Sequence, residues 1–299
     1  MAMITPAAIR ALHTTFSTVY YKAYDYTSTW HQDVASVTQS SSVSNTYGFM
    51  ARIPQMRQWV GPRVLQNISA HVYTLDNLTY ELSIVVDRED WEDHNLGTYS
   101  PLFEQMGMAG KKWPDTVMGP MIQANGNGFD GVAMFANNHP LDPAGVQTNT
   151  WNLALTAANY ATVREAMMAF TGDDGRPLNV MPNLLVVPPQ LEREALTIIN
   201  ADIIPSAAGT ASESNVLKGS AQVLVIPEFA NAATTWYLLD TSKPIKPFVW
   251  QNRRAIEFVN MATPNADNVF FNRQLIWGID GRGAAGMGCW WLAARSVGP

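Results

Sequence analysis

The segment from Arg52 to Asp93 constrains the fold more than any other part of this chain. It opens with a loop rich in arginine, tryptophan, glycine and proline, and two runs with strand character follow at residues 70–75 and 79–86. In the second run apolar and polar side chains alternate, which is the pattern of a strand with one buried face. The short turn at residues 76–78 predicts that the two runs form a β-hairpin. Because a two-stranded hairpin is only marginally stable in water, it needs a partner surface in its own subunit or in a neighbour.

The loop ahead of the hairpin carries residue types that are enriched at the energetic centres of protein interfaces. A lone tryptophan usually fills a core, but Trp59 stands between Arg57 and Arg63 in a Gly/Pro loop, which favours an inter-subunit contact. We expect both arginines to meet carboxylates of a neighbouring subunit, in the acidic stretch at residues 87–93, because bidentate Arg–carboxylate pairs supply geometry as well as energy. The expected contact residues are Arg52, Arg57, Trp59, Arg63, Tyr73, Tyr80, Asp87, Glu89, Asp90, Glu92 and Asp93.

The composition is apolar with little charge. Of 299 residues, 47% are hydrophobic and 15% are charged, below the usual quarter. A chain of this length can bury most of its apolar surface and lies near the size at which one core splits into two. The low charge favours a surface partly covered by other subunits. A single large globular enzyme explains the composition equally well.

The charge pattern disfavours direct binding of nucleic acid. The formal net charge is −6, and the densest basic spots are the pairs Lys111–Lys112 and Arg253–Arg254. Tight nucleic-acid binding usually draws on a basic footprint, which this chain lacks. A container for DNA need not hold it tightly, so a shell is still compatible with the charge.

Cysteine usage and the N-terminus bear on the compartment. Cys289 is the single cysteine, so an intrachain disulfide framework is excluded and CxxC metal motifs are absent. The first residues lack the layout of a signal peptide, and no run of about 18 apolar residues occurs. We therefore expect synthesis and assembly in a cytoplasm, with no membrane partner.

Helical periodicity predicts two elements in the first half of the chain. Apolar residues recur at helical spacing after Pro6, and the polar stretch at residues 37–48 indicates an extended arm. An amphipathic helix is predicted from Tyr99 to about Gln123. Pro114 should kink this helix or divide it in two.

The second half mixes helices and strands. A helix is predicted at residues 157–170 with Thr156 as its N-cap, and a fully apolar strand at residues 184–187 leads into a helix at residues 190–199. Further runs with strand character are residues 221–226, 236–239, 247–251, 255–259, 268–279 and 289–295. The pattern predicts an α+β fold in which a helix-and-sheet domain is interrupted by a second domain.

The acidic stretch at residues 87–93 is the first candidate for catalysis. Neighbouring carboxylates can act as general acid and base or hold Mg²⁺, and a hydrolase that uses Glu89, Asp90 or Asp93 is one alternative. A working pair needs separated roles and a cleft, which sequence neighbours on one turn rarely supply. A solvated corner between a strand and a helix is favoured, because acidic residues suit the positive N-terminal end of a helix.

Other motifs for chemistry are incomplete. His139 could ligate a metal together with Asp130 and Asp142, but the five histidines show no paired spacing, and a hydrogen-bonded loop histidine is favoured. The NGNGFDG segment lacks the Lys-Ser/Thr of a phosphate loop and indicates a turn. Cys289 has no nearby base and indicates a buried thiol. No cofactor, metal or catalytic residue is expected.

Motifs along nearly the whole chain resemble one known family. IPQMRQWVGPRV, REDWED, LGTYSPLFEQMG, FDGVAMFANNHP, GRPLNVMPNLLVVPPQLEREAL, WYLLD, IKPFVWQNRR and RQLIWGIDGR occur in this order. They are similar to the Mu-like prophage major head subunit T family, whose members are major capsid proteins of tailed phages. The resemblance implies a non-catalytic protein with a Hong Kong 97-like fold.

The resemblance also implies a division of the chain and a set of partners. An N-terminal arm (1–45), an extended hairpin loop (46–87), a peripheral domain with a long spine helix (88–151), an axial domain (152–264) and a return to the peripheral domain (265–299) are expected. The chain would assemble into pentamers and hexamers of an icosahedral virion shell around double-stranded DNA. A nanocompartment shell that encloses a cargo enzyme is the alternative of similar fold.

Two further expectations concern assembly. Because the sequence opens at Met1 without a segment to be removed, we expect no cleaved scaffolding domain, which implies a separate scaffolding protein together with a portal. Some related shells crosslink subunits through a Lys–Asn isopeptide bond. The predicted hairpin tip at residues 75–79 has no lysine, and the whole chain has only six, so we predict a non-covalent shell.

Overall fold

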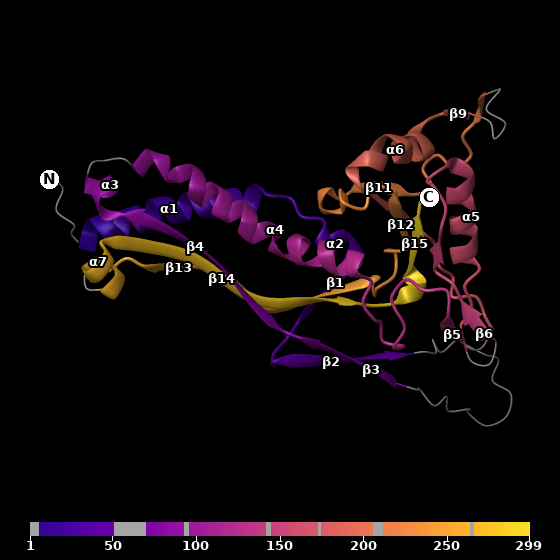
Figure 1. Ribbon diagram of the computed structural model, residues 1–299, viewed down its shortest axis with the longest axis horizontal. Coiled ribbons are helices and arrows are strands. Elements are labelled where there is room, and N and C mark those ends of the chain that lie inside the picture. The colour runs from indigo at the N-terminus through magenta and orange to yellow at the C-terminus, as the bar shows by residue number, and fades with distance from the viewer. Residues whose placement is uncertain are drawn as a thin grey trace.

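The computed structural model describes residues 6–50, 70–92, 96–141, 145–172, 175–205, 212–263 and 266–299. Helices and strands are arranged around two main sheets, one at each end of an elongated molecule (Figure 1). Helix α1, the first described element, lies in the part with the longer sheet, and the C-terminus lies in the other part. The mixture of helices and strands confirms the predicted α+β class.

The longer sheet has four strands in the order β1-β13-β14-β4. Its strands are β1 (Ala35–Gln39), β13 (Phe248–Met261), β14 (Gln274–Met287) and β4 (Leu78–Asp87). β1 runs parallel to β13, and the other neighbours are antiparallel. Helices α1 (Pro6–Tyr26) and α4 (Ser100–Ala124) lie along one face of this sheet (Figure 1).

Helix α1 forms where the apolar spacing predicts it and continues to Tyr26. Phe16 and Tyr20 are 1% exposed, and the Phe16 ring stacks on Phe103 of α4 at 4.0 Å between centroids. The edge of Trp277, from β14, meets the Phe16 ring at 5.2 Å. Since burial of one large apolar side chain contributes about 1.5–3 kcal/mol, this aromatic cluster holds both helices on the sheet.

Helix α4 is one continuous helix of 25 residues that contains Pro114 and Pro120. The helix is therefore not divided at Pro114, and the alternative, a kink at this proline, stays a prediction. A proline removes one backbone hydrogen bond, but packing on both sides supports the helix here, and Pro114 itself is buried. The contact with α1 is close: a Cβ on Gly107 would lie 2.4 Å from the Tyr20 carbonyl oxygen, so only glycine fits at this crossing.

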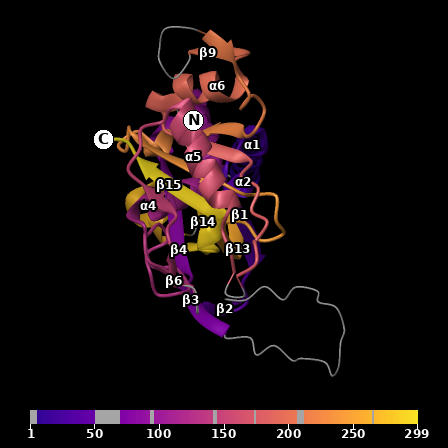
Figure 2. The same ribbon diagram turned by 90° about the vertical axis from the view of Figure 1, so that its right-hand side faces the viewer.

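The second sheet has five strands in the order β11-β8-β12-β15-β7. They are β11 (Gln222–Val225), β8 (Leu184–Val187), β12 (Thr235–Leu239), β15 (Ala293–Val297) and β7 (Thr150–Trp151). Helices α5 (Ala157–Met168) and α6 (Glu192–Asn200) belong to the same part of the molecule (Figure 2). β8 is buried throughout, and the Thr156 hydroxyl caps α5 by accepting from the Asn159 N–H, as predicted.

The pairing of the predicted hairpin is wrong, although both of its strands exist. β3 (Ala70–Asp76) pairs with β2 (Ser44–Met50), whereas β4 pairs with β14 over ten residues. Only Asn77 separates β3 from β4, which is too short for the two-residue turn of a hairpin. We call the β2–β3 pair the arm. It extends from the body away from β4 (Figure 1).

Two predicted strand runs are a single element. The runs predicted at residues 247–251 and 255–259 both lie in the 14-residue strand β13, which begins at Phe248. Its register with β14 shifts on both sides of Arg254. Such irregularities break the alternation of side chains, so the sequence shows two short strands where the structure has one. Residues 268–272 belong to helix α7 (Asp267–Asn272) rather than to a strand.

The C-terminal segment contributes to both sheets. β14 lies in the longer sheet, while β15 pairs with β12 and β7 in the second sheet. The expected division after residue 264 therefore does not separate the two sheets. Buried residues at the join, among them Trp250 and Met287, connect the longer sheet to the core of the second one.

The remaining elements are short. They are α2 (His31–Val34), α3 (Arg88–Glu92), β5 (His139–Leu141), β6 (Gly145–Gln147), β9 (Ile203–Pro205), β10 (Ser212–Ser214) and the 3-10 turns Leu96–Thr98, Pro189–Leu191, Pro227–Phe229 and Trp290–Leu292. Among the residues that the structure describes, no helix combines the length and apolar character needed to span a bilayer.

Candidate assembly site

The arm is fixed to the body by a buried amide, Gln251 of β13. Its Oε1 accepts the hydroxyl of Tyr47 in β2 at 2.7 Å, and its Nε2 donates to Asn77 Oδ1 at 2.7 Å. Gln251 is 0% exposed, so these bonds replace water that the side chain cannot reach. One side chain thus joins the arm and the start of β4 to the longer sheet.

Asn77 extends this network at the point where the arm meets β4. Its Nδ2 donates to the Ser40 hydroxyl at 2.9 Å and to the Ser42 carbonyl at 3.0 Å. Ser40 and Asn77 are both buried. Because buried polar groups are costly unless paired, the connected set favours one orientation of the arm root. The sequence did not point to these polar residues, since their hydrogen-bond partners lie far away along the chain.

Tyr73, an expected inter-subunit contact residue, lies half-buried on β3 and faces its own chain. Its hydroxyl accepts the backbone N–H of Met287 at 3.3 Å, and its side chain packs against the core of the second sheet. A Cβ on Gly286 would lie 3.2 Å from the Tyr73 ring, so the glycine leaves room for it. Within the described chain, Tyr73 therefore serves to attach the arm.

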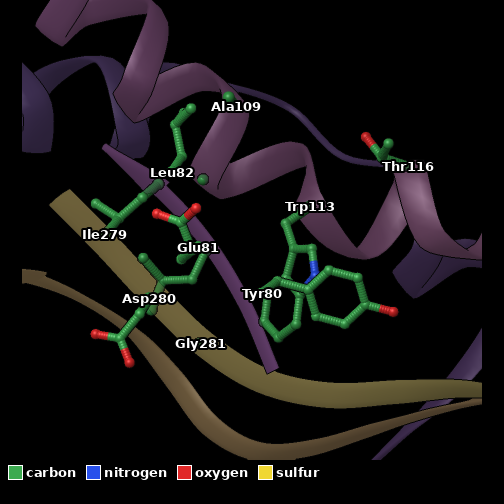
Figure 3. A pocket seen from close by; sticks show the side chains of 11 residues that line it. Tyr80, Glu81, Leu82, Ala109, Trp113, Thr116, Ile279, Asp280 and Gly281 are labelled. Carbon is green, nitrogen blue, oxygen red and sulfur yellow. The ribbon is translucent and has the colours of Figure 1, made fainter. Parts of the chain in front are cut away.

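A pocket of about 230 Å³ lies between α4 and the edge strand β4 (Figure 3). The rings of Tyr80 and Trp113 lie side by side at one end, with centroids 5.3 Å apart. Leu82 and Ile279, which are register partners, line the other end. Burial raises the pKa of the Tyr80 hydroxyl. The pocket therefore offers aromatic and aliphatic surface with one phenol.

The position of Trp113 depends on the sequence of β14. A Cβ on Gly283 would lie 3.2 Å from the Trp113 ring, and a Cβ on Gly281 would lie 3.1 Å from it. The edge of the Trp113 ring also meets Trp250 at 4.9 Å. Glycines thus let a large indole lie directly on the sheet, where it forms one wall of the pocket.

The described part of the acidic stretch, residues 87–92, forms the corner between β4 and α3. Asp87 and Glu89 are exposed, and Glu89 forms an exposed ion pair of 3.3 Å with Arg273. The Tyr99 hydroxyl donates to Asp90, and this hydrogen bond is the main cause that raises the Tyr99 pKa. These described residues confirm the predicted solvated corner and lie outside the pocket described above.

Several predicted contact residues cannot be placed. Arg52, Arg57, Trp59, Arg63 and Asp93 lie outside the described residues, as does the side chain of Glu92.

The histidine considered as a metal ligand is a buried structural residue. His139 Nδ1 lies 2.7 Å from Asp130 Oδ2, and Nε2 lies 3.2 Å from Asn149 Oδ1. The ring stacks on Trp290 at 4.1 Å between centroids. Among the described residues, no group of three His, Cys, Asp or Glu side chains is placed to hold a metal ion. The predicted hydrogen bonding of this histidine is confirmed, although His139 begins strand β5 and does not lie in a loop.

Cys289 is buried, as predicted. It is 4% exposed, and burial raises the pKa of its thiol to about 12. Because the thiolate is the nucleophilic form, this side chain is inert near neutral pH.

The long helix on an elongated sheet, the projecting arm and the second α/β part together define a phage capsid protein of the Hong Kong 97-like fold. A chain in the procapsid of bacteriophage JBD30 has this architecture, with a TM-score of 0.61 and 27% sequence identity over 98% of this chain and 76% of that chain. Another bacteriophage capsid chain, from the mature PhiM1 capsid, shares the fold at 12% identity with a TM-score of 0.58.

The family follows from the sequence match along the chain. The sequence model of the family described as "Mu-like prophage major head subunit gpT" matches residues 9–154, 151–229 and 228–298. The chain therefore belongs to this family. The major capsid protein of Escherichia phage Mu is 26% identical over 99% of this chain and 75% of its own length. The Mu-like prophage FluMu major head subunit of Haemophilus influenzae is 26% identical over 98% of this chain and 74% of its own length.

Family and fold together identify the type of protein. The chain is a major capsid protein of a tailed phage or prophage, a structural component of the virion and not an enzyme.

Proposed function

We propose that copies of this chain form rings of five and six that close into an icosahedral shell around packaged double-stranded DNA. Closed symmetry lets one surface serve repeatedly, and many weak contacts together give a durable particle. The observation that carries the proposal is the arm: a two-stranded element that projects from the body although its root is held by the buried Gln251 network. Two strands alone are marginally stable, so the part of the arm beyond the contacts of Tyr47 and Tyr73 with their own chain would rest on a neighbouring subunit.

The parts of the fold suggest their places in such a ring. We assign the arm and the residues between its strands to the extended loop, and this loop ends before β4 because β4 belongs to the longer sheet. The longer sheet with α1 and α4 corresponds to the peripheral domain. The second sheet with α5 and α6 corresponds to the axial domain around the ring centre.

The residues that contact a neighbouring subunit are part of the same proposal. The segment from Arg52 to Arg63 would meet a neighbouring subunit, and the exposed Asp87 and Glu89 are carboxylates that an arginine could reach there. A separate scaffolding protein and a portal would take part in assembly in the bacterial cytoplasm. The DNA would be enclosed without sequence-specific binding, in keeping with the net charge of −6.

Electron microscopy of the chain expressed with its scaffolding protein tests the proposal. We expect closed particles of megadalton mass that sediment far ahead of the 33.0 kDa chain. A chain that stays monomeric under these conditions would contradict the proposal. The contents separate the two kinds of shell: particles from infected or induced cells should hold nucleic acid, whereas a nanocompartment would hold a cargo enzyme.

A further inference from the structure

The buried ring of His139 lies between two hydrogen-bond acceptors. Its side chain is 0% exposed, its Nδ1 lies 2.7 Å from Asp130 Oδ2, and its Nε2 lies 3.2 Å from Asn149 Oδ1. A neutral imidazole has a single N–H and can satisfy only one of these acceptors. We propose that His139 is an imidazolium ion in the folded protein at neutral pH, and that its ion pair with Asp130 locks the junction between the two parts of the molecule.

The orientation of the Asn149 amide is fixed by its other partners. Its Oδ1 accepts the backbone N–H of Ala136 at 2.9 Å. Its Nδ2 lies within hydrogen-bond distance of three backbone carbonyl oxygens, those of Met134, Trp290 and Ala293. A rotated amide would turn its oxygen toward these three acceptors and its NH₂ group toward the Ala136 donor. The atom that faces His139 Nε2 is therefore an oxygen, and Nε2 donates to it.

Asp130 is the counter-ion of the ring. Its side chain is 5% exposed, and its Oδ1 accepts the backbone N–H of Val132 at 3.1 Å while its Oδ2 faces His139. Both oxygens thus act as acceptors, which is what an ionised carboxylate offers. Because an imidazole is a stronger base than a carboxylate, the proton between Nδ1 and Oδ2 belongs to the ring. The ring therefore carries a proton on each nitrogen.

The indole of Trp290 favours the charged form as well. It is stacked on the His139 ring, with the centroids 4.1 Å apart and the planes inclined by 7°. A cation over the face of an aromatic ring, within about 6 Å of its centroid, is attracted by the quadrupole of that ring. A buried charge is costly unless it is paired and hydrogen-bonded. Here a carboxylate, an amide oxygen and an aromatic face together compensate the loss of water.

The ion pair lies where the chain passes from one part of the molecule to the other. The connection from α4, on the longer sheet, to β7, in the second sheet, carries Asp130, His139 and Asn149. Trp290 lies in the turn that joins β14 of the longer sheet to β15 of the second sheet. The His139 ring and the Asn149 amide thus hold two chain crossings together. Loss of the ring charge would leave lone pairs of His139 Nε2 and Asn149 Oδ1 facing each other, which weakens this link.

Nuclear magnetic resonance of the histidine rings tests the charge directly. In the ¹⁵N-labelled full chain before assembly, at about pH 8, we expect two protonated ring nitrogens on His139, whereas a solvent-exposed histidine is neutral there. His13 is the internal control, because its Nδ1 lies 3.1 Å from the amide nitrogen of Asn260 and should be unprotonated. Single substitutions of the other four histidines by glutamine assign the His139 signals while its own site stays intact. An unprotonated nitrogen on His139 overturns the proposal.

Asp130→Asn tests the counter-ion, because it removes the charge and nearly preserves the size of the side chain. The His139 ring should lose its second proton at the same pH, a change that a merely space-filling Asp130 would not cause. Amide hydrogen exchange in residues 132–136 should rise roughly tenfold or more, because their link to the second sheet is weakened. Asp202→Asn, which breaks the exposed ion pair with Lys218, is the matched control and should change neither quantity.

The outcomes separate the charge, the counter-ion and the lock. A ring that keeps both protons in Asp130→Asn overturns the assignment of Asp130 as the counter-ion. A ring that loses its second proton while amide exchange stays at the wild-type rate overturns the lock. If Asp130→Asn does not fold, the wild-type spectrum still decides whether His139 is charged. None of these results depends on the proposed shell, and a neutral His139 leaves the capsid role intact.

Discussion

Asp115 and His31 are joined by two hydrogen bonds although 84 residues separate them. Asp115 Oδ1, in the middle of α4, accepts the backbone N–H of His31 at 2.9 Å and the ring Nδ1 at 2.8 Å. Its Oδ2 accepts the N–H of Trp30 at 3.1 Å. Asp115 is 1% exposed. Through these hydrogen bonds its carboxylate caps the short helix α2 and connects the chain ahead of β1 to α4.

Replacing this carboxylate should destabilise the protein. Asp115→Asn keeps the shape but turns an N–H group toward a backbone donor, so we expect a loss of about 1–3 kcal/mol in the free energy of unfolding. Urea denaturation of the unassembled chain measures it. Glu104→Gln makes the same chemical change at an exposed position of α4 and should have little effect. Equal stability of the two variants would contradict the capping role.

Gly107→Ala should also be destabilising, against helix propensity. Alanine is favoured over glycine in a helix by about 1 kcal/mol, but the new Cβ would lie 2.4 Å from the Tyr20 carbonyl oxygen. Overpacking of this kind costs about 1–3 kcal/mol and separates α1 from α4. Gly97→Ala meets nothing within 4 Å and should be neutral or slightly stabilising in the same denaturation experiment. A more stable Gly107→Ala variant would show that the helices can move apart without cost.

The root of the arm should loosen when Gln251 is made apolar. Gln251→Met removes the amide that donates to Asn77 Oδ1 and the oxygen that accepts the Tyr47 hydroxyl. Amide hydrogen exchange should then rise in both strands of the arm while the second sheet stays protected. Gln222→Met, at an exposed strand position, is the matched control. Unchanged protection of the arm in Gln251→Met would indicate that apolar contacts such as those of Tyr73 are sufficient.

Alkaline pH should unfold the protein through its buried acids. Burial raises the pKa of Cys289 from 9.0 to about 12, and it raises that of Tyr237 from 10.0 to about 12. At a pH above the pKa values that these groups have in the unfolded chain, the unfolded chain releases their protons while the folded chain keeps them. The free energy of unfolding therefore keeps the full contribution of these two groups below about pH 9. It falls as the pH rises toward 12, by up to about 1.4 kcal/mol per pH unit and group.

Tyr237→Phe tests the contribution of one of these acids. It should make the free energy of unfolding fall less steeply between pH 10 and 12 than in the wild type. Tyr26→Phe, at a position that is 84% exposed, should leave the slope unchanged. A Tyr237→Phe variant with the wild-type slope would assign the alkaline sensitivity to other groups.

Assembled particles should be non-covalent. Residues 51–69, which connect the arm strands, contain no lysine, as is also true of residues 75–79. A denaturing gel of boiled particles should show one band at 33.0 kDa. Multimers that persist under reducing conditions would reveal a crosslink between other residues.

Local patterns predicted much of the fold. The apolar stripe of α1, the buried run of β8 and the Thr156 cap of α5 all lie where the sequence places them. Each depends on interactions within a few residues, or on a buried face that periodicity reveals. The family motifs likewise predicted the capsid fold, because they extend over nearly the whole chain.

Strand pairing and the candidate site could not be predicted in the same way. A strand shows which face it buries but not which strand it will join, so β3 was assigned to β4 although it pairs with β2. The shifts of register around Arg254 concealed that β13 is one strand. The pocket under Trp113 needs the glycines of β14, which lie more than 160 positions further along the chain.

The sequence by itself determined the long helices, most of the strand runs and the family, because these follow from local periodicity and from motifs that keep their order. Only the tertiary structure decided that Gln251 and Asn77 hold the arm root, that Asp115 caps α2, and that α4 and β4 enclose a pocket. The physical reason is that a buried hydrogen bond or a cavity exists only between surfaces that folding brings together, and no single segment contains both sides of it.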